Sequence, residues 1–332
     1  MANILAQLGS IFYFIVLPIL LLVAAGYLLQ RRMGLDMATL TRLNFYFVIP
    51  ALIYQSVVSS TVSGGDFLQV ILFSLALMAG MAVLSYLAAR FLRVRREYQS
   101  VLMMTTLFYN SGNFALPLQD LAFQGMAQSA EAMSLQVFVM LVQNFTGFTL
   151  GVVLAASGQP NRHWKENLLY IVRFPPIYAL AAAIVTVQIR GLLGPDLAVT
   201  VAKAIEPFWN GLTFARNGFM AIALVSLGAQ MAMLRPVAHR YPVTLSVILR
   251  LLVAPALAIG LIWLLGLRGL VAQVVIIGAG TPTAVNSMLL CLQFDNHPDY
   301  AARAVFYSTL LSPLTVTCSI FLAQQVLPGW LW

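Results

Sequence analysis

The stretch LMMTTLFYNSGNFALPLQ, from Leu102 to Gln119, is apolar at both ends and polar at its centre. The centre holds four polar or small residues in a row, Asn110, Ser111, Gly112 and Asn113. Glycine weakens a helix, and each unmatched amide or backbone group in hydrocarbon costs roughly 2–7 kcal/mol. The stretch therefore predicts a helix that is interrupted inside a membrane and whose polar groups find a partner there.

The composition indicates the solvent in which the chain folds. Of 332 residues, 61% are hydrophobic and 8% are charged, whereas a soluble domain has about 25% charged residues. We therefore expect an all-α integral membrane protein. The net charge of +8 does not indicate a nucleic-acid partner, because the arginines fall in short loops between apolar segments. The two cysteines, Cys291 and Cys318, form no CxxC pair, and we expect neither a metal site nor a cofactor.

Segments of about 20 apolar residues, the length that crosses a bilayer, occur ten times. They cover roughly residues 11–30, 41–58, 67–89, 101–118, 133–155, 174–189, 214–232, 243–265, 270–290 and 304–326. The seventh is the least regular, because the long run around it carries Lys203, Glu206 and Arg216 in its first half. We expect that first half to form an interfacial helix that leads into the span.

The basic residues orient the chain. Most of the 18 lysines and arginines follow odd-numbered spans, namely Arg31, Arg32, Arg42, Arg90, Arg93, Arg95, Arg96, Arg162, Lys165, Arg173, Arg235, Arg240 and Arg303. The opposite loops hold only Arg190, Lys203 and Arg268. Because cytoplasmic loops are enriched in lysine and arginine, both termini are predicted on the extracytoplasmic side of an inner membrane.

The ten spans divide into two sets of five, residues 1–157 and 158–332. An odd number of spans per set places the two copies in opposite orientation. Pro18 lies 92 residues before Asn110, and Pro176 lies 105 residues before Thr281. The similar offsets predict an inverted repeat. Isolated prolines such as Pro50 are expected only to kink their helices.

The ninth span contains the counterpart of the polar cluster in the fourth. Its sequence VVIIGAGTPTAVNSMLL places Gly280, Thr281, Pro282 and Thr283 ahead of Asn286. Pro282 has no N–H and its ring clashes with the preceding helical turn. We therefore expect the fourth and ninth spans to be broken at matching depths, which is typical of a transporter binding site.

The two predicted breaks favour an anionic ligand. A half-helix that begins at the membrane centre offers unpaired N–H groups and about +0.5 elementary charge. The substrate-binding candidates are Asn110, Ser111, Gly112, Asn113, Thr281, Pro282, Thr283 and Asn286. Gln143 and Asn144, in the fifth span, either line the same cavity or bond a neighbouring helix. Aromatic residues near the expected cavity, Phe45, Tyr46, Phe47 and Tyr109, suit an indole ring or the core equally well.

The ionisable residues narrow the mechanism. All ten acidic residues and all three histidines fall in loops or at span ends, so the spans contain no obvious proton carrier. A sodium site would have to use hydroxyl and carbonyl oxygens. Arg250 lies nine residues after Tyr241, about 13 Å along a helix and deep in the membrane. Three roles for Arg250 stay open: bridging a mobile and a fixed part, attracting the substrate, or snorkelling to the cytoplasmic interface.

Several motifs resemble the auxin efflux carrier family. NSGNFALPL is similar to its fourth-span motif, here Asn110 and Pro117. GAGTPTAVNSMLLCLQFDNHPDY is similar to its ninth-span motif, a crossover proline followed by an Asn-His-Pro-Asp-like loop, here Asn296 to Asp299, and Gly280 is a structural candidate in it. LNFYFVIPALIYQSV is similar to its second span, with Asn44 and Pro50. The chain departs from the family at Gly218, where many members have proline, and it lacks the long cytoplasmic loop of the plant exporters.

The resemblance implies a fold and a function. It implies a scaffold part (spans 1, 2, 6 and 7), a mobile transport part (spans 3–5 and 8–10) in which the fourth and ninth spans cross, and a homodimer. It also implies elevator-like secondary transport of a small organic carboxylate such as an auxin, malate or malonate. We expect export, because an inside-negative potential drives an anion outward. A sodium- or proton-coupled symporter resembling bile-acid carriers is the alternative. An enzyme is not expected, since no HExxH, GxSxG or paired membrane carboxylates occur.

Overall fold

The computed structural model describes residues 2–157, 175–193, 195–233 and 242–327 of the chain. In these ranges the chain forms helices and connecting segments, with one isolated β-bridge between Tyr109 and Thr283. Eight helices are long and apolar enough to cross a membrane, namely Asn3–Met33, Met37–Ser59, Gly64–Phe91, Ser129–Ala155, Pro175–Leu192, Glu206–Met233, Val243–Leu264 and Pro298–Gln325. The prediction of an all-α membrane protein is therefore confirmed for the described residues.

The first five expected spans correspond to elements in the predicted order. These are α1 (Ala2–Ile11), η1 (Phe12–Val16) and α2 (Leu17–Met33), then α3 (Met37–Leu43), η2 (Asn44–Val48) and α4 (Ile49–Ser59), then α5 (Gly64–Phe91), then α6 (Arg96–Leu107) and α7 (Ala115–Ala122), and finally α8 (Ser129–Thr146), η3 (Gly147–Gly151) and α9 (Val152–Ala155). The first helix is longer than predicted. The fourth span is divided into two short helices, α6 and α7, as the polar cluster predicted.

The second five expected spans also correspond to elements in the predicted order. Their elements are α11 (Pro175–Leu192), α12 (Pro195–Ala204), α13 (Glu206–Asn217), α14 (Phe219–Met233), α15 (Val243–Ile248), η4 (Leu249–Val253), α16 (Ala254–Leu264), α17 (Gly269–Ala279), α18 (Val285–Gln293), α19 (Pro298–Phe321) and η5 (Leu322–Val326). The ninth span is divided into α17 and α18. The predicted boundary between the halves, at residues 157 and 158, adjoins the range 158–174, which lies outside the described residues. Five of the basic residues used to orient the chain also lie outside the described residues, namely Arg162, Lys165, Arg173, Arg235 and Arg240.

Three prolines that were expected to kink their helices share one local structure. Pro18, Pro50 and Pro255 each occupy the second position of an α-helix that directly follows a π-helical turn. Proline removes one backbone hydrogen bond and clashes with the carbonyl four residues earlier. A π-helical turn widens the helix at that carbonyl. The π-helical turn therefore accommodates each proline without ending the helix.

The beginning of the seventh span was predicted too late. The expected span begins at residue 214, but α13 starts at Glu206 and α14 continues after Gly218 to Met233. Gln55 of α4 donates hydrogen bonds to Trp209 O at 3.0 Å and to Thr213 Oγ1 at 2.7 Å. These bonds hold α13 against α4, so that α13 is part of the packed bundle, and only α12 is a separate helix ahead of it.

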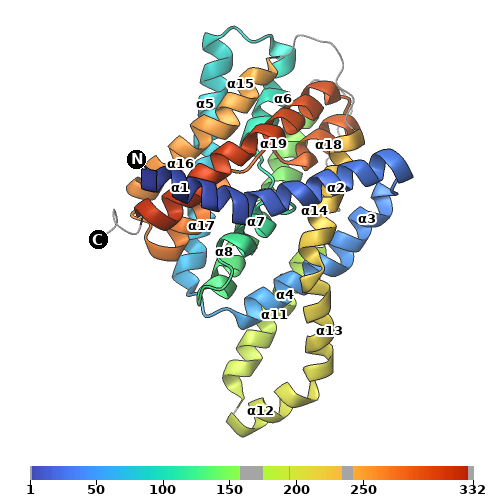
Figure 1. The fold of residues 1–332 in the computed structure, drawn as a ribbon, viewed down its shortest axis with the longest axis vertical. Coiled ribbons are helices and arrows are strands. Elements are labelled where there is room, and N and C mark those ends of the chain that lie inside the picture. Colours follow the sequence, from blue (N-terminus) through green and yellow to red (C-terminus); the bar gives the residue numbers. More distant parts are fainter. Residues whose placement is uncertain (1, 158–174, 194, 234–241, 328–332) are drawn as a thin grey trace.

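One group of helices consists of α2, α4, α11, α13 and α14. The closest pairing joins α2 with α14, and α4 packs against α11 and α13. Helices α11, α12 and α13 project from the rest of the molecule at the bottom of Figure 1. A Cβ atom added at Gly26 would overlap Val225 O, and one added at Gly228 would overlap Val23 O. Glycine at these two positions lets the two backbones touch.

Replacing Gly228 with alanine should destabilise the protein. The new methyl group has to displace the backbone of α2, and overpacking of this kind costs roughly 1–3 kcal/mol. The measurement is the midpoint of thermal unfolding of the purified protein. Gly260→Ala in α16 is the matched control, because nothing lies within 4 Å of a Cβ atom added there. Equal midpoints for the two variants would contradict the close packing of α2 on α14.

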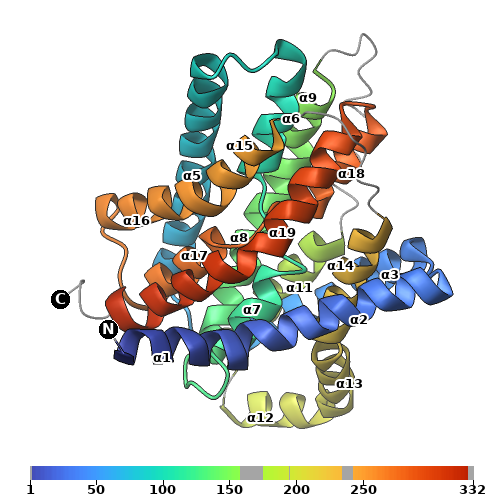
Figure 2. The ribbon, with the colours of Figure 1, turned by 45° about the horizontal axis from the view of Figure 1, so that its top comes forward.

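The second group consists of α5–α9 and α15–α19. Helix α5 contacts α6, α8 and α16, and α17 contacts α8 and α19. Helix α1 meets α19 at the left of Figures 1 and 2. The short helices α7 and α17 lie inside this group, so that the two interrupted spans are surrounded by continuous helices. The interruptions are thereby shielded from the outer surface of the bundle.

Candidate functional site

The two interruptions contact each other directly. The N–H of Asn110 donates to Pro282 O at 2.8 Å, and the N–H of Ala284 donates to Phe108 O at 2.9 Å. These two bonds form the antiparallel bridge between Tyr109 and Thr283. An unwound backbone inside a membrane has to satisfy its polar groups internally. The prediction that both spans are broken is therefore confirmed, and each break provides hydrogen-bond partners for the other.

The chain before Pro282 needs glycine for a steric reason. A Cβ atom added at Gly280 would overlap the Ser319 side chain of α19, and Thr315 Oγ1 donates to Gly280 O at 2.9 Å. The end of α17 therefore lies directly on α19. This contact explains why a glycine precedes the break, and it gives Gly280 the structural role that the motif implied.

Arg250 binds the carboxyl ends of both first half-helices. Its Nε donates to Thr281 O at 3.1 Å, its Nη1 donates to Thr106 O at 3.3 Å, and its Nη2 donates to Ala279 O. Each helix C-terminus carries about −0.5 elementary charge. One guanidinium therefore compensates both ends and satisfies carbonyl groups that the breaks leave without helical partners.

The structure decides between some of the roles left open for Arg250. The residue is fully buried, at 0% exposure, which argues against the alternative that it snorkels to the interface. Its hydrogen-bond partners belong to α6 and to the end of α17, which are both in the expected transport part, so it does not bridge the two parts. Its guanidinium lies 4.8 Å from the ring centroid of Tyr109. Tyr109, rather than Arg250, lines the neighbouring cavity.

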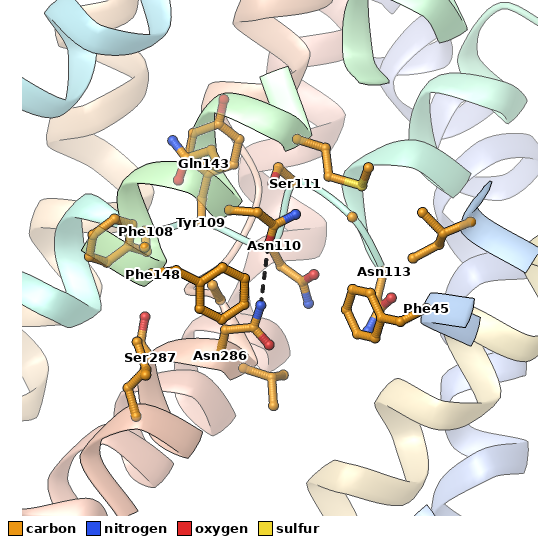
Figure 3. Close-up of a pocket in the computed structure, with 18 residues that line it drawn as sticks. Phe45, Phe108, Tyr109, Asn110, Ser111, Asn113, Gln143, Phe148, Asn286 and Ser287 are labelled. Carbon is orange, nitrogen blue, oxygen red and sulfur yellow. Dashed lines mark hydrogen bonds between the residues drawn. The ribbon is translucent and has the colours of Figure 1, made fainter. Parts of the chain in front are cut away.

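The interruptions border a cavity that contains an unsatisfied polar group. Its wall includes Asn110, Asn113, Gln143, Asn144 and Asn286 (Figure 3). Asn110 and Gln143 are 7% and 4% exposed, and Nδ2 of Asn110 has no hydrogen-bond partner among the described residues, whereas the amide of Gln143 interacts with the Tyr109 hydroxyl. The cavity has a volume of about 40 Å³, which is room for about three water molecules. A buried amide group without a partner indicates that a ligand or water completes the site.

Two helices begin at this cavity. Helix α7 starts at Ala115, after Gly112 and Asn113, and α18 starts at Val285, and all of these except Ala115 line the cavity. In the described part of the chain, the N–H groups of Val285 and Asn286 have no acceptor. The N-terminus of α18 therefore directs positive partial charge toward this space, whereas the first N–H groups of α7 already donate to Asn110 O and Gly112 O. The lining residues include no acidic or basic side chain.

The predicted site residues separate into two sets. Asn110, Ser111, Gly112, Asn113, Gln143, Asn144 and Asn286 line the cavity, whereas Thr281, Pro282 and Thr283 do not. Thr281 Oγ1 donates to Gly278 O at 2.7 Å, and Thr283 Oγ1 donates to Thr105 O at 2.8 Å. These two hydroxyl groups therefore hold the break together instead of facing the cavity.

Some amides bond one another across spans. Nδ2 of Asn44 donates to Oδ1 of Asn113 at 3.1 Å, which joins the second span to the fourth. Nδ2 of Asn286 donates to Oδ1 of Asn144 at 3.4 Å, the dashed line in Figure 3. Asn144 thus has both of the roles considered for it, because it lines the cavity and bonds a neighbouring helix. Pro117 lies in the first turn of α7. In the sequence it follows Asn113, whereas Tyr109 of the bridge precedes Asn113.

Aromatic residues form the rest of the wall. Phe45 and Tyr109 line the cavity as considered, but Tyr46 and Phe47 are exposed. The sequence reasoning missed Phe108 and Phe148. A Cβ atom added at Gly151 would lie 3.2 Å from the Phe108 ring, and one at Gly147 would lie 3.9 Å from it. Gly147 and Gly151 therefore leave room for the Phe108 ring beside the break.

Comparison with known proteins supports a transport function for the whole chain. A model of the family described as membrane transport protein matches residues 11–320. An uncharacterized transporter of Methanothermobacter thermautotrophicus is 27% identical over 90% of this chain and 93% of its own. An uncharacterized transporter of Methanocaldococcus jannaschii is 22% identical over 91% of this chain and 96% of its own. With its interrupted helices and with a match that spans almost all of its length, the chain belongs to the auxin efflux carrier-like family of membrane transport proteins.

Proposed function

We propose that the protein is a secondary transporter for a small organic carboxylate, which binds in the cavity between the two interruptions. The observation that carries the proposal is the unpartnered Nδ2 group of Asn110, in a cavity wall rich in amides and beside the N-terminus of α18. A carboxylate accepts hydrogen bonds from such a donor and is stabilised by the positive helix end. The proposed substrates are those that the family resemblance implies, namely an auxin, malate or malonate, and the cavity of about 40 Å³ has to widen to admit any of them.

The proposed architecture is ten crossings in two inverted repeats of five. The packing supports it, because the α2–α14 pair joins spans one and seven and the α11–α4 pair joins spans six and two. An inverted repeat exchanges these two pairs. The fifth and tenth spans also each contain a π-helical turn near their end, η3 and η5. Both correspondences are those expected of duplicated halves.

The proposed mechanism moves the transport part past the scaffold part. Spans 1, 2, 6 and 7 pack together as one group, and spans 3–5 and 8–10 pack as the other. The substrate cavity lies where Phe45 and Ile49 of the first group meet Asn110 and Asn113 of the second. A sliding movement of the second group carries the site across the membrane. The Asn44–Asn113 bond joins the two groups and has to break during this movement.

The proposal extends to assembly and orientation. We propose a homodimer in an inner membrane, with both termini on the extracytoplasmic side. The resemblance to the family supports the homodimer, and the uneven distribution of arginine supports the orientation. The packing of the first helix, α1, against the last long helix, α19, is consistent with an even number of crossings.

The transport should respond to voltage without a coupled ion. A single negative charge gains about 2.3 kcal/mol per 100 mV, which is close to a fifty-fold concentration ratio. The carbonyls that a sodium ion would need at the breaks already accept other bonds, as Pro282 O, Thr281 O and Phe108 O do. Uptake of labelled malonate into proteoliposomes should therefore increase when the imposed potential favours anion entry.

The same assay separates the proposal from its alternative. Proteoliposomes without a potential but with a sodium or pH gradient serve as the control condition. Uptake that follows either gradient and ignores the potential would show a coupled symporter. A prior thermal-shift screen of mono- and dicarboxylates selects the labelled anion, and the absence of any shift or uptake would contradict the carboxylate proposal itself.

A further inference from the structure

A second cavity with charged walls lies along the boundary between the two helix groups. It has a volume of about 450 Å³, and its wall contains Asp120 of α7 and Arg216 of α13. Leu52, Pro117, Met133 and Met220 supply part of the apolar wall. Helices α4, α13 and α14 of the first group therefore face α7 and α8 of the second group across this space. It is much larger than the substrate cavity, and the proposed function does not use it.

The second cavity continues the line of the first. Asn113 at the first cavity lies just before α7, and Pro117 at the second lies in its first turn, four residues later. Along α4, Ile49 borders the first cavity and Leu52 borders the second. Between the two lies a single cluster of buried apolar side chains that includes Ile49, Leu52, Leu116, Val137 and Met140. The two cavities therefore occupy opposite sides of one apolar barrier.

The two charges in the second cavity are not paired. Asp120 and Arg216 interact electrostatically, but neither forms an ion pair or a hydrogen bond within the described residues, where the ion pair found joins Arg95 and Glu97. Both side chains are partly buried. A partly buried guanidinium beside an open space is a strong binding site for a carboxylate, because Arg donates two parallel N–H groups to the carboxylate oxygens. Asp120 supplies a competing carboxylate within the chain.

We propose that this cavity is a second resting site for the transported carboxylate, on the other side of the apolar barrier, in which Arg216 binds the substrate and Asp120 takes its place when the site is empty. The inference rests on the proposed function, because it assumes that the carried molecule is an anion. The carboxylate of Asp120 competes with the substrate for Arg216. This competition lowers the affinity of the site for the anion and allows the anion to leave. Removing Asp120 should therefore strengthen anion binding, and removing the charge of Arg216 should abolish it.

The test measures the charge preference of the cavity without any transport substrate. Met220, which lines the cavity, is replaced by cysteine in a protein whose own Cys291 and Cys318 are replaced by serine. The reaction rates of this cysteine with an anionic sulfonate thiosulfonate reagent and with its cationic ammonium counterpart are compared. A charged cleft changes the local concentration of ions by 10-fold or more, so we expect a clear order among variants.

The ratio of anionic to cationic rates should rise about tenfold in Asp120→Asn and fall about tenfold in Arg216→Gln, compared with the parent protein. Arg216→Lys keeps the charge and should keep the ratio near the parent value. Phe208→Cys, on the exposed face of the same helix α13, gives the intrinsic ratio of the two reagents. Thermal unfolding verifies that each variant is folded, and Asp120→Asn and Arg216→Lys suffice if Arg216→Gln does not fold.

A ratio that does not depend on either residue would overturn the inference, and so would a preference for the cationic reagent in the parent protein. These results leave the substrate cavity untouched, because malonate uptake is measured separately. Malonate uptake that persists while the cysteine shows no charge preference refutes only the second site. The loss of all carboxylate uptake and binding in the parent protein refutes the proposed function instead.

Discussion

Replacing Asn110 with alanine should reduce carboxylate binding by roughly 10- to 100-fold, because hydrogen bonds to a charged group contribute about 1.5–3 kcal/mol. Asn110 lines the cavity, and its buried Nδ2 group has no hydrogen-bond partner among the described residues. Its backbone N–H, which bonds Pro282 O, is retained in the variant, so the two interruptions stay joined. The measurement is the affinity for malonate from thermal shifts, followed by uptake into proteoliposomes.

Two further variants define the origin of this effect. Asn110→Asp preserves the shape of the side chain but places a carboxylate in the cavity, so it should weaken binding more than alanine does. Asn210→Ala is the matched control, because Asn210 is exposed on α13 and lies away from the cavity. Unchanged malonate affinity in Asn110→Ala, with a normal unfolding midpoint, would remove Asn110 from the site and the main support for the proposed function.

Replacing Arg250 with methionine should destabilise the fold severely. The change leaves three buried carbonyl groups, those of Thr106, Ala279 and Thr281, without the donor that binds them. Each buried acceptor left unsatisfied costs about 1–3 kcal/mol, and the two helix C-termini lose their compensating charge. We expect little folded protein in size-exclusion chromatography and no uptake, a larger effect than that of any substitution in the cavity wall.

The comparison variants separate the structural role of Arg250 from a surface charge effect. Arg250→Lys keeps the charge but cannot direct several N–H groups in one plane at three carbonyls, so its unfolding midpoint should fall between those of the parent and the methionine variant. Arg95→Ala removes an exposed arginine whose ion pair with Glu97 lies on the surface, where such pairs contribute about 0–1 kcal/mol. A methionine variant as stable as Arg95→Ala would show that Arg250 does not support the two breaks.

Asn110 and Arg250 have different roles at the interruptions: Arg250 stabilises the broken helices, and Asn110 is available to a ligand. Hydroxyl groups, the β-bridge and Arg250 satisfy the carbonyl ends and the unwound backbone. The Nδ2 group of Asn110 and the N-terminus of α18 on the other side remain available to a ligand. Positive charge is therefore buried behind Tyr109, next to the cavity but not in its wall. A carboxylate in the cavity would benefit from the field of Arg250 without displacing its hydrogen bonds.

The sequence by itself determined that the chain is an all-α membrane protein and that its fourth and ninth spans are broken. Both follow from local chemistry: long apolar runs require a bilayer, and Asn-Ser-Gly-Asn or Gly-Thr-Pro-Thr cannot continue a helix in hydrocarbon without partners. The same clusters indicated Asn110, Asn113 and Asn286 as cavity residues. The extent of α13 was misjudged, because charged residues such as Glu206 and Arg216 end an apolar run without ending a helix.

Only the tertiary structure decided which polar groups face the cavity and which hold the breaks together. Thr281 and Thr283 looked equivalent to Asn286 in the sequence, but their hydroxyl groups bond carbonyls of α17 and α6. Arg250 likewise depended on carbonyl groups from two distant segments, and Asn110 found its backbone partner in Pro282. The physical reason is that the need for a hydrogen bond is a property of the residue, whereas its satisfaction depends on which distant segment the fold brings within about 3 Å.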